Sequence, residues 1–169
     1  AGAGDTVRRR RRVESVDGTV SVVDLSAGTV TSTIQVGKEP QALCLTGNGT
    51  LLYVANYVSG SVTVIDATNN TTVSEIDVSA LGGFPRSLAI TNDDDAFDND
   101  ERVVVPMFFG QLASGQTGKD EGQDLQRVGR VALIDTLDNT TVTANVTLTA
   151  MANTGFNANG STLPLLGTS

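Results

Sequence analysis

Histidine and tryptophan are absent from this 169-residue chain, which contains one cysteine and two methionines. Without histidine, the chain cannot supply a Ser-His-Asp triad, a copper site with imidazole ligands or a haem attached through a Cys-x-x-Cys-His motif. A single cysteine excludes both a disulfide within the chain and a zinc site built from cysteines. These absences remove several common classes of catalytic and metal centre.

Long apolar runs are also missing, because no stretch approaches the roughly 20 residues of a membrane-spanning helix. The net charge is −8, although five of the 11 basic residues form one run at residues 8–12. An acidic body repels phosphate backbones, so we do not expect a nucleic-acid partner. The run is followed by VESVD at 13–17 rather than by an apolar stretch, so we expect no signal peptide in this chain and any export signal to lie outside it.

A long internal repeat is the main feature that is present. GTVSVVDLSAGTVTSTIQVG at residues 18–37 returns as GSVTVIDATNNTTVSEIDVS at 60–79 and, more loosely, as GRVALIDTLDNTTVTANVTL at 129–148. A repeat of about 40 residues is a supersecondary unit, so the chain is an array of such units. Its abundant Val, Thr, Gly, Asn and Ser favour short strands joined by tight turns.

The clearest copy of the repeat predicts four strands, at residues 41–46, 51–56, 61–66 and 71–78. Segments rich in glycine and asparagine separate them, as tight turns require. The first two strands are almost continuously apolar, which is typical of strands covered on both faces, whereas the fourth is half polar, as at an edge. We therefore predict an all-β fold built from β-propeller blades of four antiparallel strands.

LLYVANYVSGSVTVIDATNNTTVSEIDVS at residues 51–79 resembles the YVTN-type β-propeller repeat. That repeat has a Leu-Tyr-Val-Ala-Asn strand, a Val-x-Val-Ile-Asp strand and a strand rich in Thr and Val. The similarity extends to the Gly-x-x-Pro link at 37–40 and covers roughly residues 13–160. This resemblance implies a propeller like those of prokaryotic surface-layer and secreted proteins.

Laying the copies over one another predicts how the chain is divided. The expected units are an arginine-rich tail or boundary without fixed structure at 1–12, the outer half of a blade at 13–36, a complete blade at 37–79, a complete blade with inserted loops at 92–101 and 111–128 within 80–150, and the start of a further blade at 151–169. The tail is expected because a shift of 42 residues places the buried strand 51–56 on the arginines, and unpaired arginines are costly to bury. A rival interpretation of the run is a basic patch for nucleic acid or an anionic membrane, which we disfavour because no aromatic residues interleave it.

These units amount to about two and a half blades, whereas a closed propeller has four to eight. The expected architecture is therefore an incomplete propeller. The missing blades are expected either in a longer chain, which we favour, or from self-association that closes a ring.

The densest group of carboxylates is NDDDAFDNDE at residues 92–101. Oxygen ligands for Ca²⁺ are available there from Asp93, Asp95, Asp98 and Asp100. Their spacing does not match an EF-hand loop. We favour a solvated acidic turn, with a calcium site and a contact for a basic partner as the alternatives, and calcium is the only cofactor that the sequence suggests.

Three aspartates, Asp24, Asp66 and Asp135, occupy the same position in the three copies. Recurrence in every blade favours a turn in which the carboxylate accepts backbone N–H bonds over a general acid or base.

The single Cys44 is interpreted as a small buried hydrophobe. Asn-x-Ser/Thr triplets begin at Asn48, Asn69, Asn70, Asn139, Asn145 and Asn159. We interpret them as turn residues, with glycosylation acceptors in a secreted protein as the alternative.

The function that the sequence favours is a non-catalytic scaffold or interaction module that is extracellular, on the cell surface or periplasmic. A protein or a component of the cell envelope is the expected partner. The alternative is part of a lactonase-like or quinoprotein-like propeller enzyme whose active-site residues lie mostly outside this chain. The two inserted loops are the candidates for an individual binding surface, because such insertions project from one end of a propeller.

Overall fold

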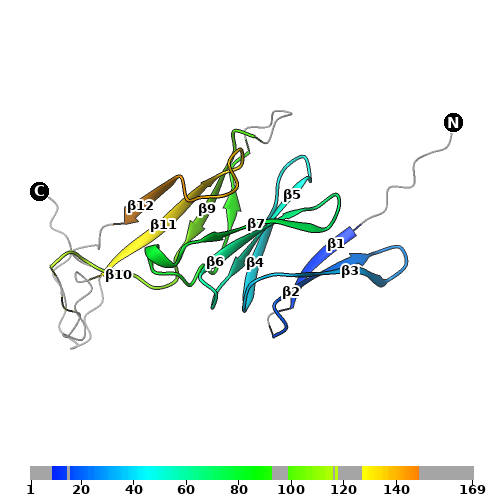
Figure 1. Cartoon of the computed structure of the whole chain (residues 1–169), viewed down its shortest axis with the longest axis horizontal. Coiled ribbons are helices and arrows are strands. Elements are labelled where there is room, and N and C mark those ends of the chain that lie inside the picture. Colours follow the sequence, from blue (N-terminus) through cyan, green and yellow to red (C-terminus); the bar gives the residue numbers. More distant parts are fainter. Residues whose placement is uncertain (1–8, 15, 93–98, 116, 118–126, 149–169) are drawn as a thin grey trace, which may run out of the picture.

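Three antiparallel sheets follow one another along the chain and lie side by side (Figure 1). They are seen in a computed structural model that describes residues 9–14, 16–92, 99–115, 117 and 127–148. Among the residues that it describes, no helix has the length and apolar character needed to cross a membrane. The predicted further blade at 151–169 and most of the predicted loop at 111–128 lie outside the described residues.

The first sheet contains β1 (Arg9–Glu14), β2 (Thr19–Asp24) and β3 (Thr29–Gln35), in that order. The second contains β4 (Pro40–Leu45), β5 (Leu51–Asn56), β6 (Ser61–Asp66) and β7 (Thr71–Asp77). A short 3-10 helix, η1 (Ser79–Leu81), follows. The third sheet contains β8 (Ala89–Ile90), β9 (Arg102–Pro106), β10 (Gln111–Leu112), β11 (Arg127–Asp135) and β12 (Ala144–Leu148).

Each strand of the second sheet pairs with the next one along the chain, and β8, β9, β11 and β12 repeat this pattern in the third. The predicted all-β fold of four-stranded antiparallel blades is confirmed, and we call the three sheets the first, second and third blades. Within the described residues, the first blade has the last three strands of the pattern.

Two apolar clusters fill the spaces between the blades. The alternation of side chains along β5 directs Leu52 and Val54 to one face and Tyr53 to the other. The cluster between the first and second blades comprises Val20, Val22, Ile34, Leu52, Val54, Ile65 and Ala67. The cluster between the second and third comprises Tyr53, Val62, Val64, Ile76, Val78, Val103, Val105, Met107, Ala132 and Ile134. The second blade is therefore covered on both faces, and each fully buried aliphatic side chain contributes about 1.5–3 kcal/mol.

The arginine run differs from the prediction, because Arg9–Arg12 lie in β1 rather than in an unstructured tail. In the pairing with β2, Arg11 lies opposite Val22 and Arg12 opposite Ser21. Arg11 is half-buried and its Nη2 donates to the Ala67 carbonyl at 2.7 Å, while Arg12 is exposed. The prediction assumed a strand covered on both faces. Here one face of the strand is open, and a backbone carbonyl accepts from one nitrogen of the guanidinium that turns inward.

The second predicted loop is also partly structured. The prediction treated 111–128 as a loop, whereas Gln111 pairs with Val128 and Leu112 with Arg127. β10 and the start of β11 thus extend the β9–β11 hairpin beyond the blade. The reason is local, because Leu112, Arg127 and Val128 continue the extended pairing of β11.

Candidate functional site

One end of the blades carries both the turns between their middle strands and the links from one blade to the next. We call it the loop end, and it comprises residues 16–18, 36–39, 57–60, 78–88 and 107–112. Backbone hydrogen bonds tie turns to links, from Tyr57 N–H to the Glu39 carbonyl at 2.9 Å and from Phe108 N–H to the Phe84 carbonyl at 3.0 Å. These bonds fix the positions of side chains that are far apart in the sequence.

Four aromatic rings meet at the loop end, although the whole chain has only five Phe and two Tyr. The ring centroid of Tyr57 lies 5.2 Å from that of Phe84 and 6.0 Å from that of Phe108. Phe109 lies 5.3 Å from Phe84 and 4.8 Å from Phe108. These spacings, with tilted or edge-to-face rings, are the favourable geometry for aromatic pairs. We call these four residues the aromatic cluster.

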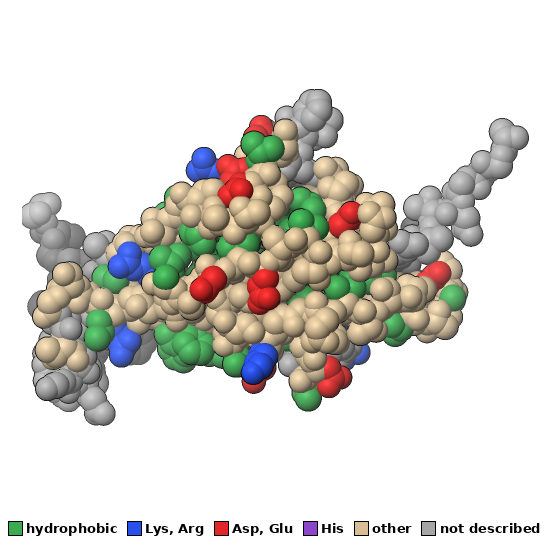
Figure 2. All heavy atoms as spheres, viewed as in Figure 1, with side chains coloured by type: hydrophobic (Ala, Val, Ile, Leu, Met, Phe, Trp, Pro, Cys, Tyr) green, Lys and Arg blue, Asp and Glu red, His purple; other side chains and the backbone are tan. Residues whose placement is uncertain are grey.

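The aromatic cluster faces solvent. Phe84 is 38% exposed, and Phe108 and Phe109 are each 48% exposed. Figure 2 shows hydrophobic side chains gathered at the lower edge of the molecule, the end of the blades that carries these loops. Exposed aromatic side chains grouped in this way are enriched at binding interfaces rather than on ordinary surface.

Arg86 completes this surface. Its Cζ lies 4.6 Å from the centroid of the Phe108 ring, which is a cation–π contact. Arg86 also lines a hollow of about 200 Å³ together with Gln41 and Tyr57. Arg86 makes no hydrogen bond or ion pair with any residue that the structure describes. The guanidinium edge is therefore available to a ligand.

The backbone that carries Phe84 is unusual. Phe84 has φ 57°, in the left-handed region that a residue with a Cβ rarely occupies. Pro85 forms a bridge with Met107 directly after it, and the Phe84 carbonyl accepts from Phe108 N–H. Such a conformation costs about 1–3 kcal/mol and persists where the surroundings enforce it, often at binding sites.

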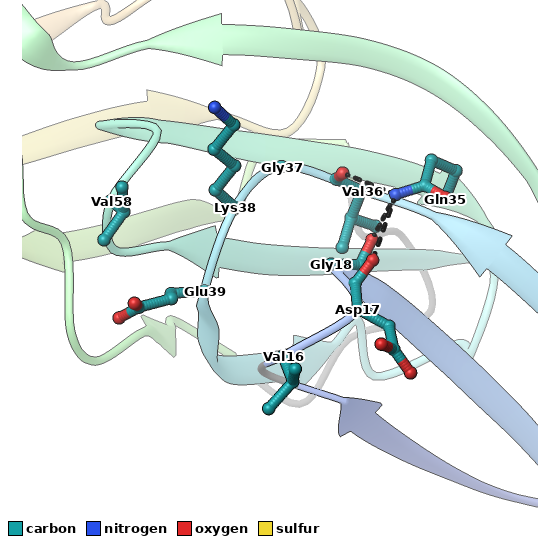
Figure 3. Close-up of a pocket in the computed structure, with 9 residues that line it drawn as sticks. All are labelled: Val16, Asp17, Gly18, Gln35, Val36, Gly37, Lys38, Glu39 and Val58. Atoms are coloured by element: carbon teal, nitrogen blue, oxygen red, sulfur yellow. Dashed lines mark hydrogen bonds between the residues drawn. The ribbon is translucent and has the colours of Figure 1, made fainter.

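A second hollow, of about 460 Å³, lies at the loop end between the first and second blades (Figure 3). It is lined by residues 16–18 and 35–39, with Val58 from the second blade. Gln35 donates through Nε2 to the Gly18 carbonyl at 2.8 Å. The side chains of Asp17, Lys38 and Glu39 point in different directions (Figure 3), so they do not converge on one ligand atom.

The predicted calcium candidates fall mostly outside the described residues. Asp93, Asp95 and Asp98 lie there, and Asp100 is exposed at the end of the blades opposite the loop end. Among the residues that the structure describes, no three or more carboxylate or thiol groups are arranged to hold a metal ion. The calcium site thus stays a prediction.

The recurring aspartates lie in turns at that opposite end. Asp24 Oδ1 accepts from Ser26 N–H and Asp66 Oδ1 from Thr68 N–H, both at 2.7 Å. Asp135 Oδ1 accepts from Leu137 N–H at 2.9 Å. The backbone bond from Asn69, followed by those from Thr68 and the Asn69 side chain, lowers the pKa of Asp66. All three carboxylates are engaged in the fold.

Two other singled-out residues, Cys44 and Asn139, take part in the packing and hydrogen bonding of the fold. Cys44 is half-buried in β4, and burial raises the pKa of its thiol to about 11. Among the triplet asparagines, Asn139 accepts a hydrogen bond from the Tyr53 hydroxyl, and its carbonyl accepts one from Ser74. Asn48, Asn69 and Asn145 are exposed, Asn70 is half-buried, and Asn159 lies outside the described residues.

The comparisons with known proteins concern the fold. No protein-family model and no curated protein matches the chain. Dihydro-heme d1 dehydrogenase NirN in complex with DHE has a TM-score of 0.54 at 15% identity, over 87% of this chain and 27% of that chain. The WD40 domain of Toxoplasma gondii coronin has a TM-score of 0.53 at 13% identity, over 80% of this chain and 30% of that one. Apo AztD from Citrobacter koseri has a TM-score of 0.51 at 13% identity, over 86% of this chain and 33% of that one.

These structures are β-propellers, and at such identities the likeness shows the fold alone. The fold of this chain is a β-propeller. The described residues form three blades of an incomplete one, and the chain spans about a third or less of the length of the similar structures.

Proposed function

We propose that this chain is part of a non-catalytic β-propeller that acts as an interaction module, with the loop end as its binding face. The aromatic cluster is the observation that carries the proposal. Four of the few aromatic residues of the chain are held together there, three of them well exposed. Large rigid aromatic side chains with a nearby arginine are the residues that dominate protein–protein binding energies.

The structural roles of the other candidates support binding over catalysis. The recurring aspartates are engaged in turns, and Cys44 is a half-buried thiol with a raised pKa. By contrast, no contact among the described residues requires the rings of the aromatic cluster to be exposed to solvent. We extend the proposal to a YVTN-type propeller at a prokaryotic cell surface, on the strength of the repeat at 51–79 and the acidic composition.

Site-specific photo-crosslinking tests this proposal. A benzophenone-bearing phenylalanine analogue replaces Phe109 in the full chain, and the matched control carries it in place of Leu137, which is 72% exposed at the opposite end of the blades. Irradiation in an extract of the source cells, followed by identification of the product and its repetition with the purified partner, is the measurement. We expect a discrete cross-link from position 109 and none from position 137.

Equal labelling from both positions, or from neither, would contradict a binding face at the loop end. Hydrolysis of a lactone by the wild-type chain, with metal ions supplied, would instead favour the propeller-enzyme alternative.

A further inference from the structure

We infer that the aromatic cluster recognises a polypeptide segment in which an apolar side chain stands beside carboxylates. This inference rests on the proposed function and names the class of partner. It combines three features of the loop end, namely the apolar surface, the guanidinium of Arg86, which has no ion-pair partner among the described residues, and the basic residues in neighbouring segments.

The apolar part of the partner is set by the aromatic cluster. Phe84, Phe108 and Phe109 present ring faces and edges to solvent, and the hollow beside Tyr57 has the size of a large side chain. Burying one aliphatic or aromatic side chain here removes apolar surface from water on both partners. The rings are already packed against one another, so little side-chain entropy is lost on binding.

The acidic part of the partner is set by Arg86. Its guanidinium lies over Phe108, 4.6 Å from the ring centroid, and has no hydrogen-bond or ion-pair partner among the described residues. An arginine stacked on an aromatic ring keeps its N–H edge free, and that edge matches the two oxygens of a carboxylate. Gln41, which is exposed and also lines the hollow, adds an amide donor.

Two further cations adjoin the cluster in a chain whose net charge is −8. Lys38 is exposed, and its carbonyl accepts from Val58 N–H at 3.2 Å, directly after Tyr57. Arg127 is exposed and donates through Nη1 to the Gly110 carbonyl at 2.9 Å, directly after Phe109. Figure 2 shows the hydrophobic patch of the lower edge with basic side chains on either side.

The acidic residues at the loop end are Glu39, exposed beside Lys38, together with Asp17 and Asp77. Ser79 N–H donates to Asp77 at 2.7 Å, so this carboxylate is engaged in the fold. At physiological salt, charges more than about 8 Å away are largely screened. Arg86, which lies over the Phe108 ring, is therefore the charge nearest to a peptide bound on the cluster.

Fluorescence anisotropy with three labelled peptides tests the inference on the full chain. Each peptide has the same length and a central Leu-Phe pair, flanked by Asp and Glu in one, by Asn and Gln in the second and by Lys and Arg in the third. The protein variants are Arg86→Ala, Arg86→Lys and Phe108→Ala. The matched controls are Arg102→Ala and Leu137→Ala, which remove an exposed arginine and an exposed apolar residue at the opposite end.

We expect the acidic peptide to bind about tenfold or more tightly than the neutral one, and the basic one to bind weakest. Arg86→Ala and Phe108→Ala should each weaken the binding of the acidic peptide by about tenfold. Arg86→Lys should recover only part of the affinity that Arg86→Ala loses, because lysine is a point charge. Binding should weaken as salt rises, and the controls should stay within about twofold of wild type.

Equal binding of the acidic and neutral peptides, lost in Phe108→Ala alone, would overturn the acidic partner and leave the proposed binding function standing. If light scattering gave a lower mass in solution for Phe108→Ala than for wild type, a second copy of the chain would occupy this surface, and the inference would be overturned. No binding of any peptide, together with no cross-link from position 109, would overturn both the inference and the proposed function.

Discussion

Asn56 lies directly against Gly37, the residue in the link between the first and second blades. A Cβ atom added to Gly37 would lie 2.7 Å from both Cγ and Nδ2 of Asn56. Asn56 is fully buried, and its amide donates to Ser61 Oγ at 3.1 Å and to Thr63 Oγ1 at 2.7 Å. The link therefore passes the amide at a distance that only glycine permits.

Gly37→Ala should lower the free energy of unfolding by about 1–3 kcal/mol, because the added methyl group displaces a buried, hydrogen-bonded side chain. Urea denaturation followed by circular dichroism measures this loss. Gly129→Ala is the matched control, since its Cβ would meet only the Leu148 side chain, at 3.4 Å. If both substitutions had the same effect, close packing at Gly37 would not be the reason for its glycine.

Tyr53→Phe should destabilise the contact between the second and third blades. The Tyr53 hydroxyl donates to Asn139 Oδ1, and removing it should cost about 1 kcal/mol. The control is Tyr57→Phe, because the Tyr57 hydroxyl has no hydrogen bond within the described residues. A thermal midpoint that falls equally in both variants would contradict a specific role for the Tyr53 hydroxyl.

Stability should decline at acid pH. The pKa values of Asp66 and Asp138 are lowered from 3.8 by hydrogen bonds, chiefly from the Asn69 backbone and the Thr140 side chain respectively. A folded-state pKa below the unfolded one means that each carboxylate stabilises the fold above pH 3.8 and loses this contribution as the pH falls through the folded value.

The free energy of unfolding, measured from neutral pH down to about pH 3, should therefore fall less in Asp66→Asn than in wild type. The exposed Asp100→Asn removes the same charge outside these turns and serves as the control. An unchanged acid-dependent loss in Asp66→Asn would contradict the turn as its source.

Cys44 should react slowly with a thiol reagent in the folded chain. Burial raises its pKa to about 11, so very little of the reactive thiolate exists near neutral pH. The rate of disulfide exchange with Ellman's reagent, compared before and after unfolding in urea, is the measurement. We expect a clear acceleration on unfolding, and equal rates would show that the thiol is accessible in the native fold.

The outer face of the third blade should promote association. Val146 is 42% and Leu148 is 52% exposed there, and Val146 pairs with Val131. The corresponding face of the first blade carries polar residues such as Ser21, paired with Thr33. Replacing Val146 by Thr and Leu148 by Ser should lower the mean mass found by light scattering. Val30→Thr, at a 58% exposed position of the first blade, should leave the mean mass unchanged.

The blades could be predicted from the sequence because their signals are local. Gly60 and Asp66 bracket a strand whose alternation and turns lie within a few residues of one another, and the next copy repeats them. The placement of the arginines in β1 could not be predicted this way, because it depends on which face of the first blade is covered. A repeat alignment carries no information on that point.

The aromatic cluster could not be predicted from local pattern either. Tyr57 belongs to a turn, Phe84 to a link and Phe108 to the segment after β9, and only the packing of two blades brings them together. One signal was available in retrospect. In a chain with 4% aromatic residues, these positions all lie in segments that a propeller places at the same end.

The covering of the second blade on both faces sets the order in which the chain opens to solvent. Amide protons of β5 and β6 should exchange last, since their release requires two neighbouring blades to separate, whereas each outer blade can open by losing one contact. A partner seated on the seam between the second and third blades would hold these two blades together. Its binding energy would then appear as slower exchange along β9 and β11, as far as the ends of these strands opposite the bound surface.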